Sequence, residues 1–129
     1  MKPNWTELEN LKTINELADA AHANAREKGF HHDGLDDKQF LERHCMLLVG
    51  EVAELHEALR KGEADNHCDK AAKMIEMGLP GLTCAEEELA DIMIRALDIS
   101  RRLNIDITRA IQAKHGYNTT RPHMHGKKF

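Results

Sequence analysis

The chain has 129 residues, 41% of them hydrophobic and 31% charged, with only three prolines, a composition typical of one globular, helix-rich domain rather than a disordered chain. The formal net charge of −4 argues against a general nucleic-acid binder, and three cysteines without a Cys-x-x-Cys spacing argue against a disulfide framework. Because no apolar run approaches the roughly 20 residues that span a bilayer and no signal-peptide pattern is present, we expect a cytoplasmic protein without a membrane partner.

The first part of the chain predicts one long helix followed by a loop. The capping-box sequence Thr6-x-x-Glu9 indicates that this helix begins at Thr6. Apolar residues then recur at helical spacing as far as Gly29, where the helix should end. Residues 30–37 are typical of a loop.

A second helix follows this loop. Asp36 or Asp37 can cap it, and it should run to about Arg60 and stop at Gly62. On a helical wheel Glu51 and Glu54 fall on or beside its apolar stripe. Two carboxylates therefore occupy positions where an amphipathic helix normally places leucine.

The middle of the chain predicts a connection and then a third long helix. Residues 62–82 have turn residues at both ends and a short helix-like piece from Asp69 to Met77, so we expect a mobile connection there. Thr83-x-x-Glu86 is a second capping box, and it opens a helix through Leu103 that is apolar around most of its circumference. A helix of this kind needs more than one neighbour, and dimerisation would supply one.

The end of the chain predicts a short helix and a basic tail. Asp106 or Thr108 can start the helix, which should end near Gly116, and the sequence from Tyr117 onward should be irregular. The segment from residue 107 to residue 129 has no acidic residue. Its five positive charges belong to Arg109, Lys114, Arg121, Lys127 and Lys128. We call residues 115–129 the basic tail. The whole chain, residues 1–129, should form one all-α domain, a four-to-five-helix bundle completed by oligomerisation.

Two pairs of acids at i,i+3 spacing point to a metal site between two helices. The proposed ligands, named here the four-acid site, are Glu51, Glu54, Glu88 and Asp91. Residues three apart on a helix are neighbours, so each pair can reach one shared point. Carboxylate oxygens suit Mg²⁺, or Mn²⁺, better than zinc. Because Mg²⁺ usually takes further ligands from substrate phosphates, Lys114, Arg121 and the lysines of the basic tail would clamp those phosphates.

Other interpretations of these acids remain open. A Glu-x-x-Glu on a helix usually belongs to a solvated face. Asp91 has Arg95 one turn later, so an ordinary i,i+4 ion pair could satisfy it without a metal. The chain could instead be a non-catalytic helical interaction module. Its acids would then form interhelical ion pairs with Arg95, Arg101 and Arg102.

The nine histidines show no zinc-ligand spacing. We therefore expect His31 and its neighbours in the loop to be solvated, and His44 and His56 to be packed or half-buried. Asp98 is interpreted as an ordinary surface charge.

The ordered motifs resemble those of the MazG-like superfamily of all-α nucleoside triphosphate pyrophosphohydrolases. The signature Glu-x-x-Glu followed by Glu-x-x-Asp matches the four-acid site, and the match covers roughly residues 38–128. The downstream pattern continues with Lys114, Tyr117, Asn118 and Arg121, then His125-Gly126-Lys127-Lys128.

The resemblance implies Mg²⁺-dependent hydrolysis of a (deoxy)nucleoside triphosphate to the monophosphate and pyrophosphate, by a homodimer or homotetramer. It implies catalytic and metal-binding roles for the four acids. It implies substrate binding by Lys114, Tyr117, Asn118, Arg121, Lys127 and Lys128. A phosphoribosyl nucleotide is an alternative substrate within the same superfamily.

The chain departs from the family pattern at one residue and in the length of one spacer. Many members have two adjacent glutamates at the start of the first motif, but this chain has Gly50 before Glu51, which removes one candidate base for activating water. The spacer between the two motifs, residues 55–87, is somewhat long, as a lid or a substrate-selective insertion would be.

Overall fold

The computed structural model describes residues 4–8, 13–32 and 34–128. This described part is helical and contains no strand, only an isolated antiparallel bridge between His67 and Thr83. The helices are α1 (Trp5–Leu8), α2 (Ile14–Glu27), α3 (Asp37–Arg60), α4 (Ala71–Glu76), α5 (Cys84–Arg102) and α6 (Ile107–Thr119), with a 3-10 turn over His123–Gly126. The prediction of an all-α fold is confirmed. None of these helices combines the length and the apolar character that crossing a membrane requires.

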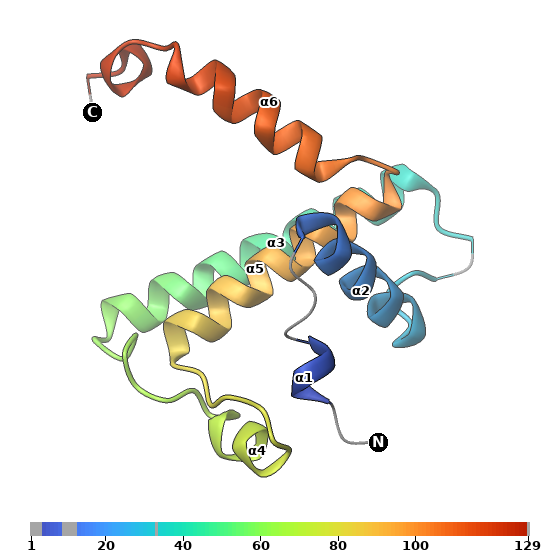
Figure 1. Cartoon of the computed structure of the whole chain (residues 1–129), viewed down its shortest axis with the longest axis vertical. Coiled ribbons are helices and arrows are strands. Elements are labelled where there is room, and N and C mark those ends of the chain that lie inside the picture. Colours follow the sequence, from blue (N-terminus) through green and yellow to red (C-terminus); the bar gives the residue numbers. More distant parts are fainter. Residues whose placement is uncertain (1–3, 9–12, 33, 129) are drawn as a thin grey trace.

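The centre of the molecule is built from α2, α3 and α5. Helices α3 and α5 run alongside each other in opposite directions, and α2 packs against α5 (Figure 1). Their contact buries Ala18, Phe40 and Leu97, at 0%, 0% and 6% exposure. Because α5 lies between two neighbours, its side chains can reach both α2 and α3.

The two central helices begin where their capping sequences predict. The Asp36 carboxylate accepts a hydrogen bond from Gln39 N while the Gln39 side chain bonds back to Asp36 N, and α3 starts at the next residue. Thr83 and Glu86 form the same reciprocal pair at the start of α5. Gly62 has φ of +71°, a left-handed conformation that favours glycine and ends α3.

The prediction for the first helix is wrong at its start. Thr6 lies inside α1, and its backbone N–H bonds to the Asn4 side chain. The long helix instead begins after Thr13, whose hydroxyl accepts a hydrogen bond from Glu16 N at 3.1 Å. Thr13-x-x-Glu16 is therefore the capping sequence that operates here. The partner predicted for Thr6, Glu9, lies outside the described residues.

The last helix is longer than predicted. It extends past Gly116 to Thr119, so Tyr117 and Asn118 are helical rather than irregular. Asp106 caps its start by accepting from Arg109 N. Helix α6 contacts α2 but diverges from α3 and α5, so that the C-terminus lies far from the centre (Figure 1).

The connection between α3 and α5 is folded onto the start of α5. Cys68 N donates to Leu82 O at 2.9 Å, and Cys84 N donates to Asn66 O at 2.8 Å. Cys68 and Ala71 are buried. The connection thereby places Lys70 beside Glu87 of α5, and the two side chains form an ion pair.

Both central helices keep large apolar side chains exposed. On α3 and α5 seven such residues are about half exposed or more, so this single chain leaves part of each helix uncovered. They are Met46, Val49, Val52, Leu59, Leu89, Met93 and Ile94.

Candidate metal-binding site

Three of the four predicted ligands converge between α3 and α5. One carboxylate oxygen from each of Glu51, Glu54 and Glu88 lies within 4.8 Å of the others. We call these residues the three-acid group. Glu51 and Glu54 are one turn apart on α3, and the antiparallel packing of α5 brings Glu88 opposite them.

Glu88 is the member of this group whose negative charge is least compensated. Its Oε2 atom is buried and has no hydrogen-bond partner among the described residues. Burial, followed by the neighbouring carboxylates of Glu54 and Glu87, raises the pKa of Glu88 from 4.5 to about 7. A buried carboxylate oxygen without a donor is costly, so this position favours a proton or a cation.

Asp91 lies one turn further along α5 and does not belong to the three-acid group. Burial, then the charges of Glu51 and Glu87, raises the pKa of Asp91 above its ordinary value. Among the three acids of the group, Glu51 is thus the one whose charge most raises the pKa of Asp91.

Two cations compensate part of this negative charge. Arg95 Nε donates to Glu51 Oε1 at 2.6 Å, across the contact between α5 and α3. The predicted i,i+4 partner of Arg95 was Asp91, but the recorded ion pair joins it to Glu51 instead. Lys70 pairs with Glu87, a buried acid that directly precedes Glu88 and is not one of the predicted ligands. The bond to Glu87 raises the pKa of Lys70, so the lysine stays charged.

The other two arginines of the interaction-module hypothesis also form ion pairs between elements. Arg101 pairs with Asp19 of α2 at 2.8 Å, and Arg102 pairs with Asp37 of α3 at 3.1 Å. Neither acid belongs to the four-acid site. Only Glu51 among the four acids thus has an arginine partner in the described structure.

A cavity of about 170 Å³ opens beside these acids. Glu51, Asp91 and Arg95 line its charged side, whereas Phe30 and Ile94 are among its apolar walls. Typical pockets for a whole drug-sized ligand measure roughly 300–1,000 Å³, so this one suits part of such a ligand.

The predicted phosphate-binding residues lie together but apart from the acids. Lys114 Nζ lies 4.8 Å from the centre of the Tyr117 ring, and the Arg121 guanidinium lies 5.6 Å from it. Asn118 has a buried Oδ1 without a partner among the described residues and lines an open groove of about 360 Å³ along α6. Lys127 and Lys128 are exposed beyond the 3-10 turn. Because α6 diverges from α5, one chain alone does not bring these groups to the three-acid group.

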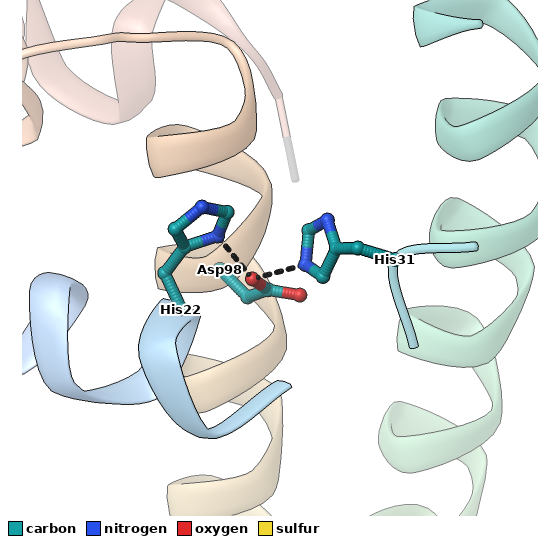
Figure 2. A group of neighbouring side chains, drawn as sticks. All are labelled: His22, His31 and Asp98. Atoms are coloured by element: carbon teal, nitrogen blue, oxygen red, sulfur yellow. Dashed lines mark hydrogen bonds and ion pairs between the residues drawn. The ribbon is translucent and has the colours of Figure 1, made fainter. Parts of the chain in front are cut away.

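Three predictions about histidines and Asp98 are wrong. Asp98 is 4% exposed rather than a surface charge, and its Oδ1 contacts both His22 and His31 (Figure 2). The side chain of His31 is 3% exposed rather than solvated. His56 is exposed rather than packed, whereas His44 is buried as predicted. We call His22, His31 and Asp98 the histidine–aspartate cluster. No spacing in the sequence links them, because only the packing of α2 and the loop on α5 brings them together.

The three-acid group fits a hard divalent cation. All its donor atoms are carboxylate oxygens, and Glu88 Oε2, which has no hydrogen-bond partner within the described ranges, could bind an ion without losing another bond. Arg95 competes for Glu51, so a cation that binds there must displace or reorient this arginine. No family model matches the chain, and the searches of curated proteins and of solved structures found no match either.

The raised pKa of Glu88 predicts a specific dependence of stability on pH. The folded state binds this proton more tightly than the unfolded chain does, so the free energy of unfolding should fall as the pH rises from about 4.5 to about 7. In Glu88→Gln this contribution is absent, and the variant should lose less stability over the same range. Urea unfolding of both proteins between pH 4.5 and 8 measures the difference. Parallel pH profiles for the two proteins would contradict the assignment.

Proposed function

We propose that this chain is a Mg²⁺-dependent nucleotide pyrophosphohydrolase of the MazG-like type, which cleaves a (deoxy)nucleoside triphosphate to the monophosphate and pyrophosphate. The observation that carries the proposal is the convergence of Glu51, Glu54 and Glu88, together with the buried Oε2 of Glu88, which finds no hydrogen-bond partner in the described part of the chain. Three anions at one point are costly alone and favourable around a divalent cation. A bound Mg²⁺ supplies neutralisation of the polyphosphate, polarisation of the phosphoryl group and a lower pKa for coordinated water.

The acids divide this work by position. Glu51, Glu54 and Glu88 would hold the ion from the two facing helices. Asp91 lies outside this group, one turn further along α5, and would add negative charge beside it. Mn²⁺ offers a similar preference for oxygen ligands and can substitute. Arg95, which is bound to Glu51, lies at the edge of the cavity, where a guanidinium can move from that carboxylate to a phosphate.

The cavity supports the binding of a nucleotide next to these acids. Phe30 and Ile94 give it apolar walls for a flat ring, and its volume suits one part of a nucleotide rather than the whole. The triphosphate would then extend toward Glu51 and Asp91. A phosphoribosyl nucleotide fits the same description, since its base and phosphates have the same chemistry.

A second copy of the chain completes this proposal. The half-exposed apolar side chains of α3 and α5 need a cover, and a dimer or tetramer provides it. Lys114 and Asn118 on the diverging α6, and Arg121 just beyond its end, would then clamp the phosphates at the acids of a neighbouring subunit. Tyr117, Lys127 and Lys128 would assist them. The opposite charges of the basic tail and the acids favour this arrangement.

The base that activates water is not identified by the family pattern, because Gly50 occupies the position where many members have a glutamate. A Cβ added at this residue would meet no atom within 4 Å, so packing does not require a glycine there. The chain therefore relies on another group, and Glu54 is the most exposed member of the three-acid group.

The alternative function is a helical interaction module without catalysis. The observation in its favour is the ion pair between Arg95 and Glu51, which satisfies one of the acids without a metal. The unpartnered oxygen of Glu88 argues against it, because an evolved ion-pair network should satisfy its buried members.

The activity prediction uses single changes at the acids. Full-length protein with Mg²⁺ should release pyrophosphate from at least one member of a panel of ribonucleoside and deoxyribonucleoside triphosphates and phosphoribosyl nucleotides. Glu54→Gln and Asp91→Asn should lower the rate by roughly 10²-fold or more, since each removes charge stabilisation in the transition state. Glu57→Gln is the matched control, because Glu57 lies one turn past Glu54 but pairs with Arg60 on the surface. Equal rates in wild type, Glu54→Gln and Asp91→Asn would contradict the site assignment.

A second prediction separates the enzyme from the interaction module. Mg²⁺ should raise the melting temperature of the wild type, because an ion bound only to the native state adds about 2.7 kcal/mol at 100 times its Kd. Arg95→Gln removes the competing cation, so its melting temperature without Mg²⁺ should fall and its gain with Mg²⁺ should exceed that of the wild type.

The matched control is Arg101→Gln, which breaks an ion pair to Asp19 away from the acids. Its gain with Mg²⁺ should equal that of the wild type. If the chain is an interaction module, Mg²⁺ should leave the melting temperature of all three proteins unchanged. That result would overturn the metal proposal.

A further inference from the structure

The histidine–aspartate cluster joins three segments of the chain at one carboxylate oxygen. His22 lies on α2, His31 lies in the loop before α3, and Asp98 lies on α5. His22 Nδ1 is 2.9 Å from Asp98 Oδ1, and His31 Nε2 is 2.8 Å from the same oxygen (Figure 2). One potential ligand atom from each residue lies within 4.8 Å of the other two. The packing of α2 and the loop on α5 thus gathers two imidazoles and a carboxylate around one small volume.

The surroundings of the cluster hold these side chains in place. The rings of His31 and Phe40 stack, with their centres 4.6 Å apart and their planes at 25°. The rings of His22 and His31 are nearly perpendicular, at 86°. Figure 2 shows the two rings on opposite sides of Asp98, so their nitrogens reach its carboxylate from different directions.

We propose that this cluster is a binding site for one divalent transition-metal ion of the zinc type. Two imidazoles and one carboxylate form a donor set that suits Zn²⁺ or Co²⁺, whereas Mg²⁺ prefers oxygen ligands alone. Three protein ligands leave the fourth position for water. The side chain of His22 is 21% exposed, which gives solvent and the ion a way in, while Asp98 and His31 stay buried.

A hydrogen-bonded network without a metal is the competing interpretation. Arg102 Nη1 lies 3.4 Å from His31 Nδ1, and because a guanidinium only donates, this contact places the proton of a neutral His31 on Nε2, toward Asp98. Metal binding at Nε2 moves that proton to Nδ1 and breaks the contact. Arg102 keeps its bonds to Asp37 Oδ1 at 3.1 Å and Leu35 O at 2.8 Å. The two hydrogen bonds from the histidines to Asp98 would be replaced by bonds to the metal, so the long Arg102 contact is the one interaction lost without replacement.

The proposed ion has a structural consequence for the cavity. Asp98 lines the cavity, and so do Ala21, which precedes His22, and Phe30, which precedes His31. An ion bound by the cluster would therefore connect three segments that form the wall of the cavity. Asp98 follows Asp91 by seven residues, about 10.5 Å along a helix axis. The cluster thus contacts α5 about two turns away from Asp91. The proposed ion would stabilise the walls of the cavity, and its binding does not depend on hydrolytic activity.

The test is a titration of the full chain with Co²⁺, followed by visible absorption, in the presence of excess Mg²⁺ and without a polyhistidine tag. Wild type should bind one equivalent with the visible bands of tetrahedral Co²⁺, and Zn²⁺ should displace it. His22→Ala should weaken binding by at least about 100-fold, since changes outside the ligand shell already cost 10–100-fold. His22 is partly exposed, so this variant should fold, as circular dichroism can check. Asp98→Asn is the second variant, because it keeps the side-chain size and removes the anionic ligand.

Two controls fix the location of the signal. Glu54→Gln changes the three-acid group, and His32→Ala changes the exposed histidine beside His31, and both should keep the tetrahedral bands. Wild type without these bands would overturn the proposal. Bands that survive in both His22→Ala and Asp98→Asn, or that disappear in Glu54→Gln, would also overturn it.

Discussion

Carboxylates crowd the contact between α3 and α5, and their charge must be balanced for the two helices to pack together. The helices that bury Phe40 and Leu97 also force Glu51, Glu54 and Glu88 together. Protein cations neutralise only part of this charge, because Arg95 reaches Glu51 while the buried Oε2 of Glu88 has no partner among the described residues. Because this negative charge is not balanced, Glu88 binds a proton more tightly than usual, and its pKa is raised. A divalent cation satisfies the same electrostatic demand at neutral pH, which is why the fold and the proposed chemistry are linked.

Helix α5 is the element that connects the proposed functions. Within its length it presents Glu88 and Asp91 to the acids of α3, and Asp98 to the histidines of α2 and the loop. Residues seven apart lie on the same face of a helix, so Asp91 and Asp98 both line the cavity between these groups. A shift of α5 along its axis would therefore alter both candidate ion sites and the cavity together.

Local rules predicted the starts of the central helices well, because Thr83 has the capping partner Glu86 three residues later and Asp36 was one of two adjacent candidate caps for α3. The first helix was misplaced because Thr6 and Thr13 both begin a capping sequence inside one apolar-periodic stretch, and sequence spacing does not choose between them. The burial of Asp98 depends on elements far away in the chain, so its polar character suggested a surface position. The convergence of Glu51, Glu54 and Glu88 was predictable from helical spacing, but the choice of Arg95 between two acids depends on how the helices cross.

The proposal that the crowded acids hold a divalent cation can be tested by anomalous diffraction from crystals grown with Mn²⁺. The anomalous scattering locates the ion without assumptions about activity. We expect a peak between α3 and α5 with oxygens of Glu51, Glu54 and Glu88 as ligands, at about the 2.0–2.1 Å expected for Mg²⁺ or slightly longer. Arg95 should then have left Glu51. A crystal without such a peak, in which Arg95 remains on Glu51, would refute the metal site.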